Sequence, residues 1–532
     1  MPLFPTDHIQ LNQQEGGFDT AKGYKTSLSL EMPEPTLSTS NGLLIYEQQE
    51  THWINTIGVS SAGGDKEKKG FSLSLSSLDL PKHDLTEFKT CNREQEHAQE
   101  DGTGLGNLKL STNQIIRLAG ERFVEFTSHM FININANIHP YGSNLTGLTV
   151  DDKMDVELVQ LILTVVEKLS HKQTDKACRL LSNCTKLASN IGRPVQRVVF
   201  YFAEALAKKI ERETGKVVSN IWEAENPVGP TISSKLNYDS AILACNQKLP
   251  FSQVMRFAGV QAMLDNIKMN SKVHLIDIQM QTGVTWAVLM QALAKQEGYK
   301  VKQLKLTVIE TIDKESVKAK CTHLQNFAKT LNLIFFYHII FLSDMKDITD
   351  NQFEVEADEA IVVYAPFVLR TMIVRPHCLE ILMNTMKRLN PSVMVITEYE
   401  VNHNSPSFVN RFIEALFYYS ATFDCLEDCM ERNDQDRMAL ESGIFRCGIH
   451  NIVATEGTKG VTRSVTIEVW RAFFERFGMV EVQLSESSLY QAQLVLQTFP
   501  CANSCSLGKK GKGLVVAWKG SPRCTLSAWS FS

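Results

Sequence analysis

From residue 272 onward, apolar runs short enough for strands alternate with amphipathic stretches long enough for helices, and this alternation constrains the fold most. The predicted strands occupy 273–278, 304–310, 333–341, 360–367 and 392–401, with helices predicted at 285–296, 314–331 and 377–389. Strands that are apolar along nearly their whole length are typical of parallel sheets covered on both faces. The sequence therefore predicts the α/β class, with a Rossmann-like, mostly parallel sheet.

The C-terminal part of the chain predicts further elements around this sheet. Helices fit 407–427, 466–477 and 488–499, and a strand fits 479–484. Two apolar runs near the end, GLVVAWKG and CTLSAWS, predict an antiparallel pair of strands. We expect this pair to form an antiparallel edge of the sheet.

The region 111–265 has a helical pattern. Ser111 or Thr112 is a suitable N-cap for the first helix, and Asp151 and Asp152 begin the second, where the helix dipole favours acids. One stripe of the second helix is apolar and consists of Leu158, Leu161, Ile162, Val165 and Leu169. Core packing accounts for most of the leucines, but the stripe is wide enough to serve a partner helix as well. We therefore divide 111–532 into a helical cap, 111–265, and an α/β core, 266–532.

The first 105 residues differ from the rest in composition and charge. They hold 16 Asp and Glu against 8 Lys and Arg, which gives −8, whereas the whole chain has 59 acids and 54 bases and a net charge of −5. Their Ser-, Thr-, Gly- and Gln-rich sequence has no sustained period, which predicts a mostly disordered acidic region. An acidic tail and a negative total charge argue against broad electrostatic binding to nucleic acid.

The cysteines and the hydropathy pattern exclude several classes of protein. The 12 cysteines include no C-x-x-C pair, and Cys425 and Cys429 have the spacing of one helix face. We interpret them as reduced structural thiols rather than metal ligands. No run reaches the ~18 apolar residues of a membrane helix, and MPLFPTDHIQ lacks the features of a secretory signal. The sequence predicts no metal site and no membrane association.

The stretch VHLIDIQMQTG at 273–283 is where a nucleotide-binding βα unit would hold its ligand. The dinucleotide fingerprint needs glycines for backbone to approach a pyrophosphate, but Gly283 is the only glycine in this turn. Glu310 ends the next predicted strand, near the position of a ribose-binding acid. Asp277, Gly283 and Glu310 are therefore weak candidates for a cofactor site, and strand-end acids that only reach solvent are the alternative.

Other signs of catalysis are missing from the sequence. There is no G-x-S-x-G elbow, no Walker A sequence and no H-E-x-x-H. His274 lies inside an apolar strand, so a hydrogen-bonded core histidine is favoured over a general base. Asp277 is either an anchor for neighbouring backbone amides or the remnant of a ligand site. We predict no catalytic residue and no cofactor.

Four blocks of the sequence, in order from about residue 111 to the C-terminus, resemble the plant GRAS regulators. The family's VHIID block is represented by Val273, His274, Leu275, Ile276 and Asp277, followed by Gly283 and Trp286. The leucine-rich regions precede and follow this block. The PFYRE and SAW regions and the family's tryptophan spacings are represented by Pro391, Phe417, Tyr418, Trp470, Gly478, Trp518, Ser527, Ala528 and Trp529.

The resemblance implies a nuclear, non-enzymatic regulator of transcription. Such a protein would bind DNA-binding transcription factors and other GRAS proteins, with at most weak direct binding to DNA. The leucine-rich helices would supply the partner surface, which points to Leu158, Leu161, Leu169, Leu180 and Leu181. The family fold resembles Rossmann-type methyltransferases with a helical cap, so a small-molecule-binding or methyltransferase-like protein is the alternative. The three motif tryptophans would mainly pack the C-terminal layer.

The sequence also departs from the family pattern. It is closest to the DELLA group but has neither a DELLA nor a TVHYNP sequence, so we do not expect control by gibberellin. Ala287 stands where a proline usually follows the tryptophan, and the PFYRE region keeps Glu456, Gly457 and Arg463 without the usual acidic-basic cluster. Contacts that depend on that cluster are therefore not expected.

Overall fold

The computed structural model describes residues 110–129, 148–215, 235–295, 300–457 and 461–532. The acidic region predicted at 1–105 lies outside the described residues. No helix in the described ranges combines the length and the apolar character that crossing a membrane requires.

One sheet organises the core, and five of its strands are parallel. Its strand order is β3-β2-β1-β4-β5-β9-β8-β7, with β6 paired to the outer part of β9. The first five strands run parallel to one another, and β6 to β9 add antiparallel pairs. The bounds are β1 Lys272–Ile278, β2 Gln303–Glu310, β3 Ile334–Phe341, β4 Glu359–Pro366, β5 Val393–Tyr399, β6 Met479–Val482, β7 Cys505–Lys510, β8 Gly513–Trp518 and β9 Ser521–Phe531. The predicted Rossmann-like, methyltransferase-like sheet with an antiparallel edge is confirmed, and β7 is one strand more than the sequence predicted.

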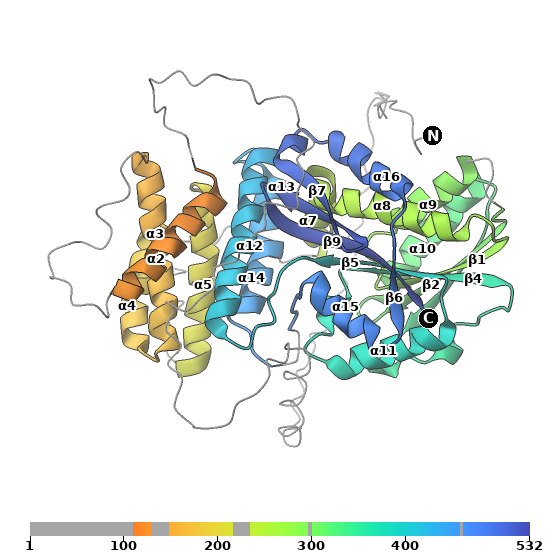
Figure 1. Cartoon of the computed structure of the whole chain (residues 1–532), viewed down its shortest axis with the longest axis horizontal. Helices are drawn as coiled ribbons and strands as arrows, with labels where there is room; N and C mark the ends of the chain where they lie inside the picture. The colour runs from red at the N-terminus through yellow and green to blue at the C-terminus, as the bar shows by residue number, and fades with distance from the viewer. Residues whose placement is uncertain (1–109, 130–147, 216–234, 296–299, 458–460) are drawn as a thin grey trace, which may run out of the picture. The chain divides into compact units, whose positions relative to one another are not determined.

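Helices cover both faces of this sheet. In Figure 1, α8, α9 and α16 lie above the sheet, and α11 and α15 lie below it. α10 packs beside α9 and on β3. The bounds are α8 Pro250–Ile267, α9 Val284–Lys295, α10 Lys314–Thr330, α11 Pro376–Leu389, α15 Ile467–Glu475 and α16 Glu486–Gln497. A parallel strand is apolar along its length because helices bury it from both sides, as in β1, where six of seven residues are buried.

The helical cap is built from two distant parts of the chain. Its N-terminal helices are α2 Thr112–His129, α3 Val150–Ser170, α4 Thr174–Leu187 and α5 Pro194–Thr214. These share one hydrophobic cluster with α12 Phe408–Cys429 and α14 Arg446–Val453. In α12, buried residues occur on every side, including Phe412, Leu416 and Phe423. A helix that is apolar all round has to lie between two layers, and α12 lies between the cap helices and β9.

The predicted cap range, 111–265, therefore needs correction. α8 packs on α16, β9 and β5, and α7 Lys235–Lys248 packs on α8 and on α13 Gln435–Ala439. Both helices thus belong with the core, while α12 and α14 belong to the cap as well. Gly259 of α8 faces the sheet, since a Cβ at this position would lie 3.4 Å from Leu526 of β9 and 3.5 Å from Val395 of β5.

The predicted helix starts are confirmed. Ser111 rather than Thr112 caps α2, since its Oγ accepts from the Gln114 backbone amide at 3.3 Å and its own amide donates to the Gln114 side chain at 2.8 Å. Asp151 and Asp152 lie in the first turn of α3. These two hydrogen bonds fix the start of α2, and therefore where the helical cap begins.

Candidate functional site

The turn after β1 keeps the backbone path of a ligand-binding βα unit. β1 lies between β2 and β4, where the strand order reverses, and ligands of open α/β sheets bind in the crevice at that point. Gln279 leaves the strand with φ of +63°, and Gly283 enters α9 with φ of +73°. A left-handed conformation is easy for Gly283 and strained for Gln279. We call residues 279–283 the β1 turn.

Side chains of the β1 turn bond to neighbouring strand ends. The Gln279 amide donates to Thr311 Oγ1 at 2.8 Å, and the Gln281 amide donates to the Pro366 carbonyl at 3.4 Å. Met280 is buried, and its sulfur would lie 3.6 Å from a Cβ on Gly283. Three side chains of the turn are thus held by contacts within the protein.

Asp277 is held by a tryptophan rather than by backbone amides. The Trp286 indole N–H donates to Asp277 Oδ2 at 2.6 Å, and both side chains are buried. Burial raises the pKa of Asp277 to about 7, against the opposing effect of the indole hydrogen bond. Among the described residues, Asp277 Oδ1 has no hydrogen-bond partner. One oxygen is therefore structural, and the other faces a small cavity.

Glu310 does not join the other two cofactor candidates. Its Oε1 accepts from the backbone amides of Thr311 and Ile312, both at 2.8 Å. This local cap holds the carboxylate at the end of β2, and Glu310 is not among the residues that line the cavity. Asp277 and Gly283 do line it, so the structure brings two of the three predicted residues together.

The cavity has a volume of about 30 Å³ and is lined by residues that sequence analysis missed. Arg256 of α8 lines it and donates to Asn246 Oδ1 at 3.2 Å. In the described part of the chain, no carboxylate pairs with this guanidinium, and burial lowers the pKa of Arg256. Thr397 Oγ1 also lines the cavity without a hydrogen-bond partner from the described residues. No sequence signal pointed to Arg256, because its helix was assigned to the cap.

His274 is a core residue, as expected. Its Nε2 lies 2.7 Å from Thr307 Oγ1, and the side chain is fully buried between β2 and β4. Burial lowers the pKa of His274 to about 4. A neutral, enclosed imidazole bonded to a threonine cannot reach a substrate. The other block residues, Val273, Leu275 and Ile276, are also fully buried.

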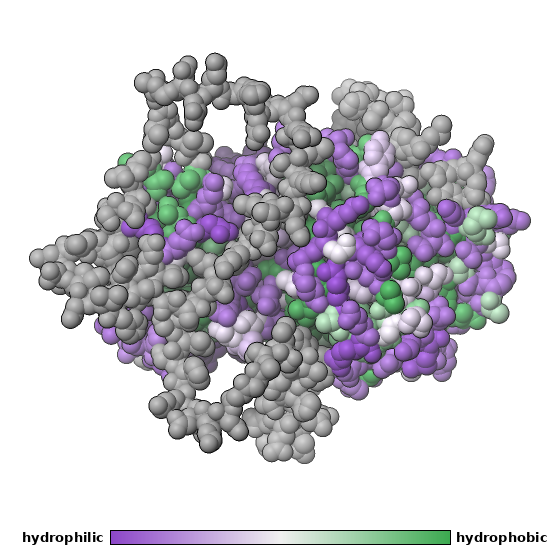
Figure 2. All heavy atoms as spheres, viewed as in Figure 1, coloured by the Kyte–Doolittle hydropathy of each residue, from purple (hydrophilic) through white to green (hydrophobic). Residues whose placement is uncertain are grey.

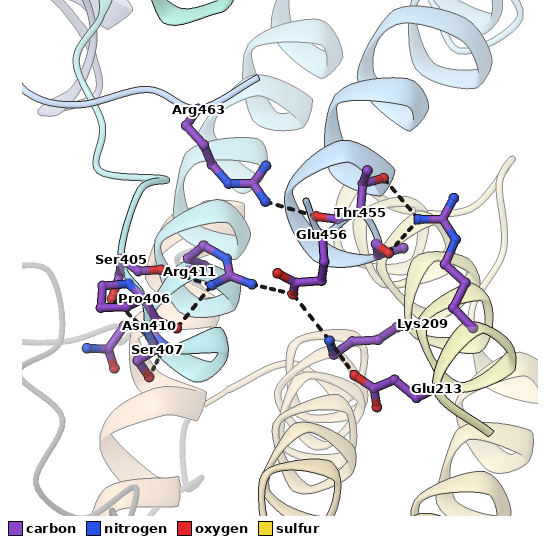
Figure 3. Close-up of polar contacts among 12 residues, drawn as sticks. Lys209, Glu213, Ser405, Pro406, Ser407, Asn410, Arg411, Thr455, Glu456 and Arg463 are labelled. Atoms are coloured by element: carbon purple, nitrogen blue, oxygen red, sulfur yellow. Dashed lines mark hydrogen bonds and ion pairs between the residues drawn. The ribbon is translucent and has the colours of Figure 1, made fainter. Parts of the chain in front are cut away.

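A polar junction joins the cap to the PFYRE region (Figure 3). Glu456 Oε1 lies 2.7 Å from Arg411 Nη2 of α12 and 3.5 Å from Lys209 Nζ of α5. Arg463 donates to the Thr455 carbonyl at 2.9 Å, and Arg212 of α5 donates to the Ala454 carbonyl at 2.7 Å. Glu456 and Arg463 thus hold this segment against α5 and α12, although the acidic-basic cluster of the family is missing.

The leucines predicted to bind partners mostly face the cap's own core. Leu158 and Leu181 are each 2% exposed, and Leu161, Leu169 and Leu180 pack, partly buried, against the same cluster. The stripe of α3 faces α2, α4 and α5, because the apolar face of a helix buries first against its neighbours in the chain. Leu158 and Leu181 are therefore core residues.

A different set of apolar side chains on the cap is exposed. We define the cap surface as Val150, Met154, Leu187 and Ile191, which are 73%, 47%, 49% and 74% exposed. Arg193 bonds to Asp155 at 2.7 Å and to Asp151 at 3.2 Å, and thereby holds the connection after α4 beside the start of α3. Figure 2 shows an apolar area over this end of the cap. These four residues lie outside the predicted leucine stripe, so the sequence pattern did not indicate this surface.

The motif residues of the C-terminal blocks are structural. Trp470 stacks on Phe474 at 5.5 Å between ring centroids, and Trp529 packs on the same ring at 4.8 Å. Trp518 lies elsewhere and donates to Asp424 Oδ2 of α12 at 2.9 Å. The remaining motif residues are buried, apart from the half-buried Tyr418 and Gly478: Pro391, Phe417, Ser527 and Ala528. This agrees with the predicted packing role of the tryptophans, which each contribute most when buried.

Comparisons with known proteins agree with this architecture. The model of the GRAS domain family matches residues 158–530. The DELLA protein RGL3 of Arabidopsis thaliana is 29% identical over 385 residues, covering 72% of this chain and 70% of the relative. The DELLA protein GAI1 of Vitis vinifera is 28% identical, and the match spans 71% of this chain but only 62% of that relative, less than two thirds of its length. The crystal structure of SCL7 of Oryza sativa matches with a TM-score of 0.62 and 27% identity, covering 70% of this chain and 99% of that one.

Proposed function

The chain belongs to the GRAS domain family, a family of plant transcriptional regulators, and on this premise we propose that it regulates transcription in the nucleus by binding other proteins. Its partners in this proposal are DNA-binding transcription factors and other GRAS proteins. The observation that carries the proposal is the contrast between a β1 turn whose side chains bond to neighbouring strand ends and a cap surface that leaves four apolar side chains in water.

The cap surface has the properties of a protein-binding site. Removing apolar area from water contributes about 25 cal/mol per Å², so covering four exposed apolar side chains favours association. Asp151 and Arg193 border the surface with charge, and an apolar centre with a polar rim is typical of protein interfaces. The held position of the 188–193 connection reduces the entropy that binding would cost.

Direct contact with DNA contributes little in this proposal. The net charge of −5 opposes phosphate binding, which requires a basic surface. The arginines and lysines of the polar junction are bonded to Glu456, Glu213 and backbone carbonyls. Sequence specificity would then come from the DNA-binding partner.

A tethering assay tests the regulatory function. The full chain is fused to a heterologous DNA-binding domain in plant cells, together with a fluorescent tag and a reporter gene that carries the cognate sites. We expect nuclear fluorescence and a reporter level that differs from that of the DNA-binding domain alone. An unchanged reporter in cells that accumulate the fusion in the nucleus would contradict the proposal.

The cavity beside Asp277 supports a second candidate function, the binding of a small organic acid. Arg256 would pair with a carboxylate, and Asp277 Oδ1 and Thr397 Oγ1 could bond to hydroxyl groups, since each lacks a partner in the described part of the chain. Calorimetric titration of the full chain with glycolate tests this candidate, with Arg256→Gln as the control. Binding that the Arg256→Gln variant loses would support it, and no heat at millimolar glycolate would count against it.

A further inference from the structure

The outer edge of β3 lacks the features that normally protect an edge strand. Among the described strands, β3 and β7 end the sheet, and β3 pairs only with β2. β7 carries Lys509 and Lys510, and charged side chains, lysine above all, keep an edge strand from pairing with other strands. β3 reads IFFYHIIF, without lysine, arginine, aspartate, glutamate or proline, and its register with β2 has no bulge. Proteins normally cover an edge of this kind.

Every second residue of β3 directs its backbone groups away from β2. The Leu342 amide, just after the strand, donates to the Glu310 carbonyl of β2 at 2.9 Å. Because the bonding direction alternates from one residue to the next along a strand, the even-numbered residues of β3 bond to β2. The N–H and C=O groups of the odd-numbered residues point outward, and these residues are Phe335, Tyr337, Ile339 and Phe341. They offer a full row of hydrogen bonds to an added strand.

Apolar side chains line one face of this edge. α10 packs on β3, and the Tyr337 hydroxyl lies 3.4 Å from Thr322 Oγ1 of α10. Since successive side chains of a strand point to opposite faces, Ile334 and Phe336 lie on the face away from α10. They are 54% and 53% exposed. An added strand with apolar side chains on that face would cover both.

A segment of the N-terminal region has the matching pattern. Residues 71–76 read FSLSLS, in which Phe71, Leu73 and Leu75 alternate with serines and no residue is charged. In a strand, these three apolar side chains would share one face and the serines the other. The segment lies outside the described residues, as does the connection 77–109 that leads to α2.

The connection is long enough to bring the segment to β3. Extended, residues 77–109 span roughly 100 Å. A folded protein of the size of residues 110–532 has a diameter of roughly 55 Å. Because the segment belongs to the same chain, its local concentration at β3 exceeds that of a separate protein at micromolar concentration. This favours the chain's own segment over a second copy as the occupant of the edge.

We propose that residues 71–76 add to the outer edge of β3 as a further strand of the sheet. The outward N–H and C=O groups of β3 pair with the segment. Its phenylalanine and leucines pack beside Ile334 and Phe336, on the face away from α10. The serines lie on the other face, where the hydroxyls of Thr322 and Tyr337 are exposed. The added strand prevents this edge from pairing with other molecules.

Hydrogen exchange of the full chain, followed by mass spectrometry of peptides from β3, tests this inference. Leu73→Asp combined with Leu75→Asp places two charges on the apolar face of the segment and should release it. We expect the outward amides of β3 to exchange at least ~10-fold faster in this double variant than in the unaltered chain. The amides that bond to β2 should not change. Unchanged exchange of β1 shows that the variant keeps its fold.

The matched control is Leu28→Asp combined with Leu30→Asp. These leucines lie in TSLSLE at 26–31, which has the same alternation, and the control should leave the exchange of β3 unchanged. Faster exchange in the control alone would mean that a different segment covers the edge, and the proposal would be wrong. Equal exchange of β3 in all three proteins would also overturn it. If that exchange becomes faster on dilution, a second copy covers the edge instead.

Discussion

The β1 turn holds its side chains in contacts within the protein, whereas the cap surface exposes apolar side chains to water. In the turn, Gln279 and Gln281 bond to neighbouring strand ends and Met280 is buried, and just after the turn Trp286 bonds to Asp277. On the cap, valine, methionine, leucine and isoleucine side chains point into water although neighbouring leucines are buried. A fold can thus keep the backbone of a ligand site while the residues that remain available for binding lie on another part of the molecule.

The largest effect should come from replacing Trp286, whose indole bonds to Asp277 beside the β1 turn. Trp286→Ala leaves a cavity and an unpaired, buried Asp277, so we expect the free energy of unfolding to fall by about 3–5 kcal/mol. Chemical denaturation of the purified chain measures this. Trp286→Phe keeps most of the volume and loses only the indole donor, so its cost should be smaller. Equal stability of Trp286→Ala and the unaltered chain would contradict a structural role.

Charges on the cap surface should weaken partner binding without changing stability. For Met154→Asp combined with Ile191→Asp, we expect at least a ~30-fold loss of affinity for a transcription-factor partner, since residues at the centre of an interface contribute about 2 kcal/mol or more. The matched control is Met269→Asp combined with Val480→Asp, two exposed apolar residues outside the cap surface. Biolayer interferometry gives the affinities. Equal losses in both double variants would mean that the cap surface is not specific.

The titration of Asp277 should make stability depend on pH. Its folded pKa is raised to about 7, above the unfolded value, so its contribution to stability is complete below about pH 4 and is lost as pH rises through 7. Asp277→Asn cannot titrate and can still accept from the indole of Trp286. We expect the stability of the unaltered chain to fall relative to this variant by on the order of 2 kcal/mol between pH 4 and 8. Parallel curves for the two proteins would show that Asp277 does not titrate in this range.

The smallest effect concerns the support of the cap surface. Arg193→Met removes the ion pairs to Asp151, which is exposed, and to Asp155, which is buried, so we expect a loss of about 1–2 kcal/mol in stability. Partner affinity should fall a few-fold, because the 188–193 connection is then less well held. Arg432→Met removes an exposed ion pair to Glu427 away from this surface and should leave partner affinity unchanged. The same loss of partner affinity in both variants would show that Arg193 has no specific role in partner binding.

The parallel sheet could be predicted from the sequence because most of its strands are buried from both sides. β1, β4 and β5 are buried along nearly their whole length, and the edge strand β3 is apolar although most of it is not buried. β7 was missed because CSLGKK is half-buried and has no apolar alternation. β7 forms because it pairs with β8, and this pairing exists only in the folded protein.

The candidate sites were harder to predict because they depend on long-range packing. The leucine stripe of α3 indicated a cap, but the same pattern suits a core and an interface, and the structure buries Leu158 and Leu181. α12 joins the cap from more than 200 residues further along the chain than α5. Arg256 lines the same cavity as Asp277 only because α8 packs on the sheet. No local pattern contains that information.

The difference between the β1 turn and the cap surface is tested most directly by identifying the partners that each variant still binds. Tagged versions of the unaltered chain, the cap-surface double variant, its matched control and Trp286→Phe are purified from plant nuclei, and the bound proteins are identified by mass spectrometry. We predict that transcription factors and GRAS proteins bind to the unaltered chain, the control and Trp286→Phe, and are depleted from the cap-surface variant. An undiminished set of partners on a folded cap-surface variant would contradict the account.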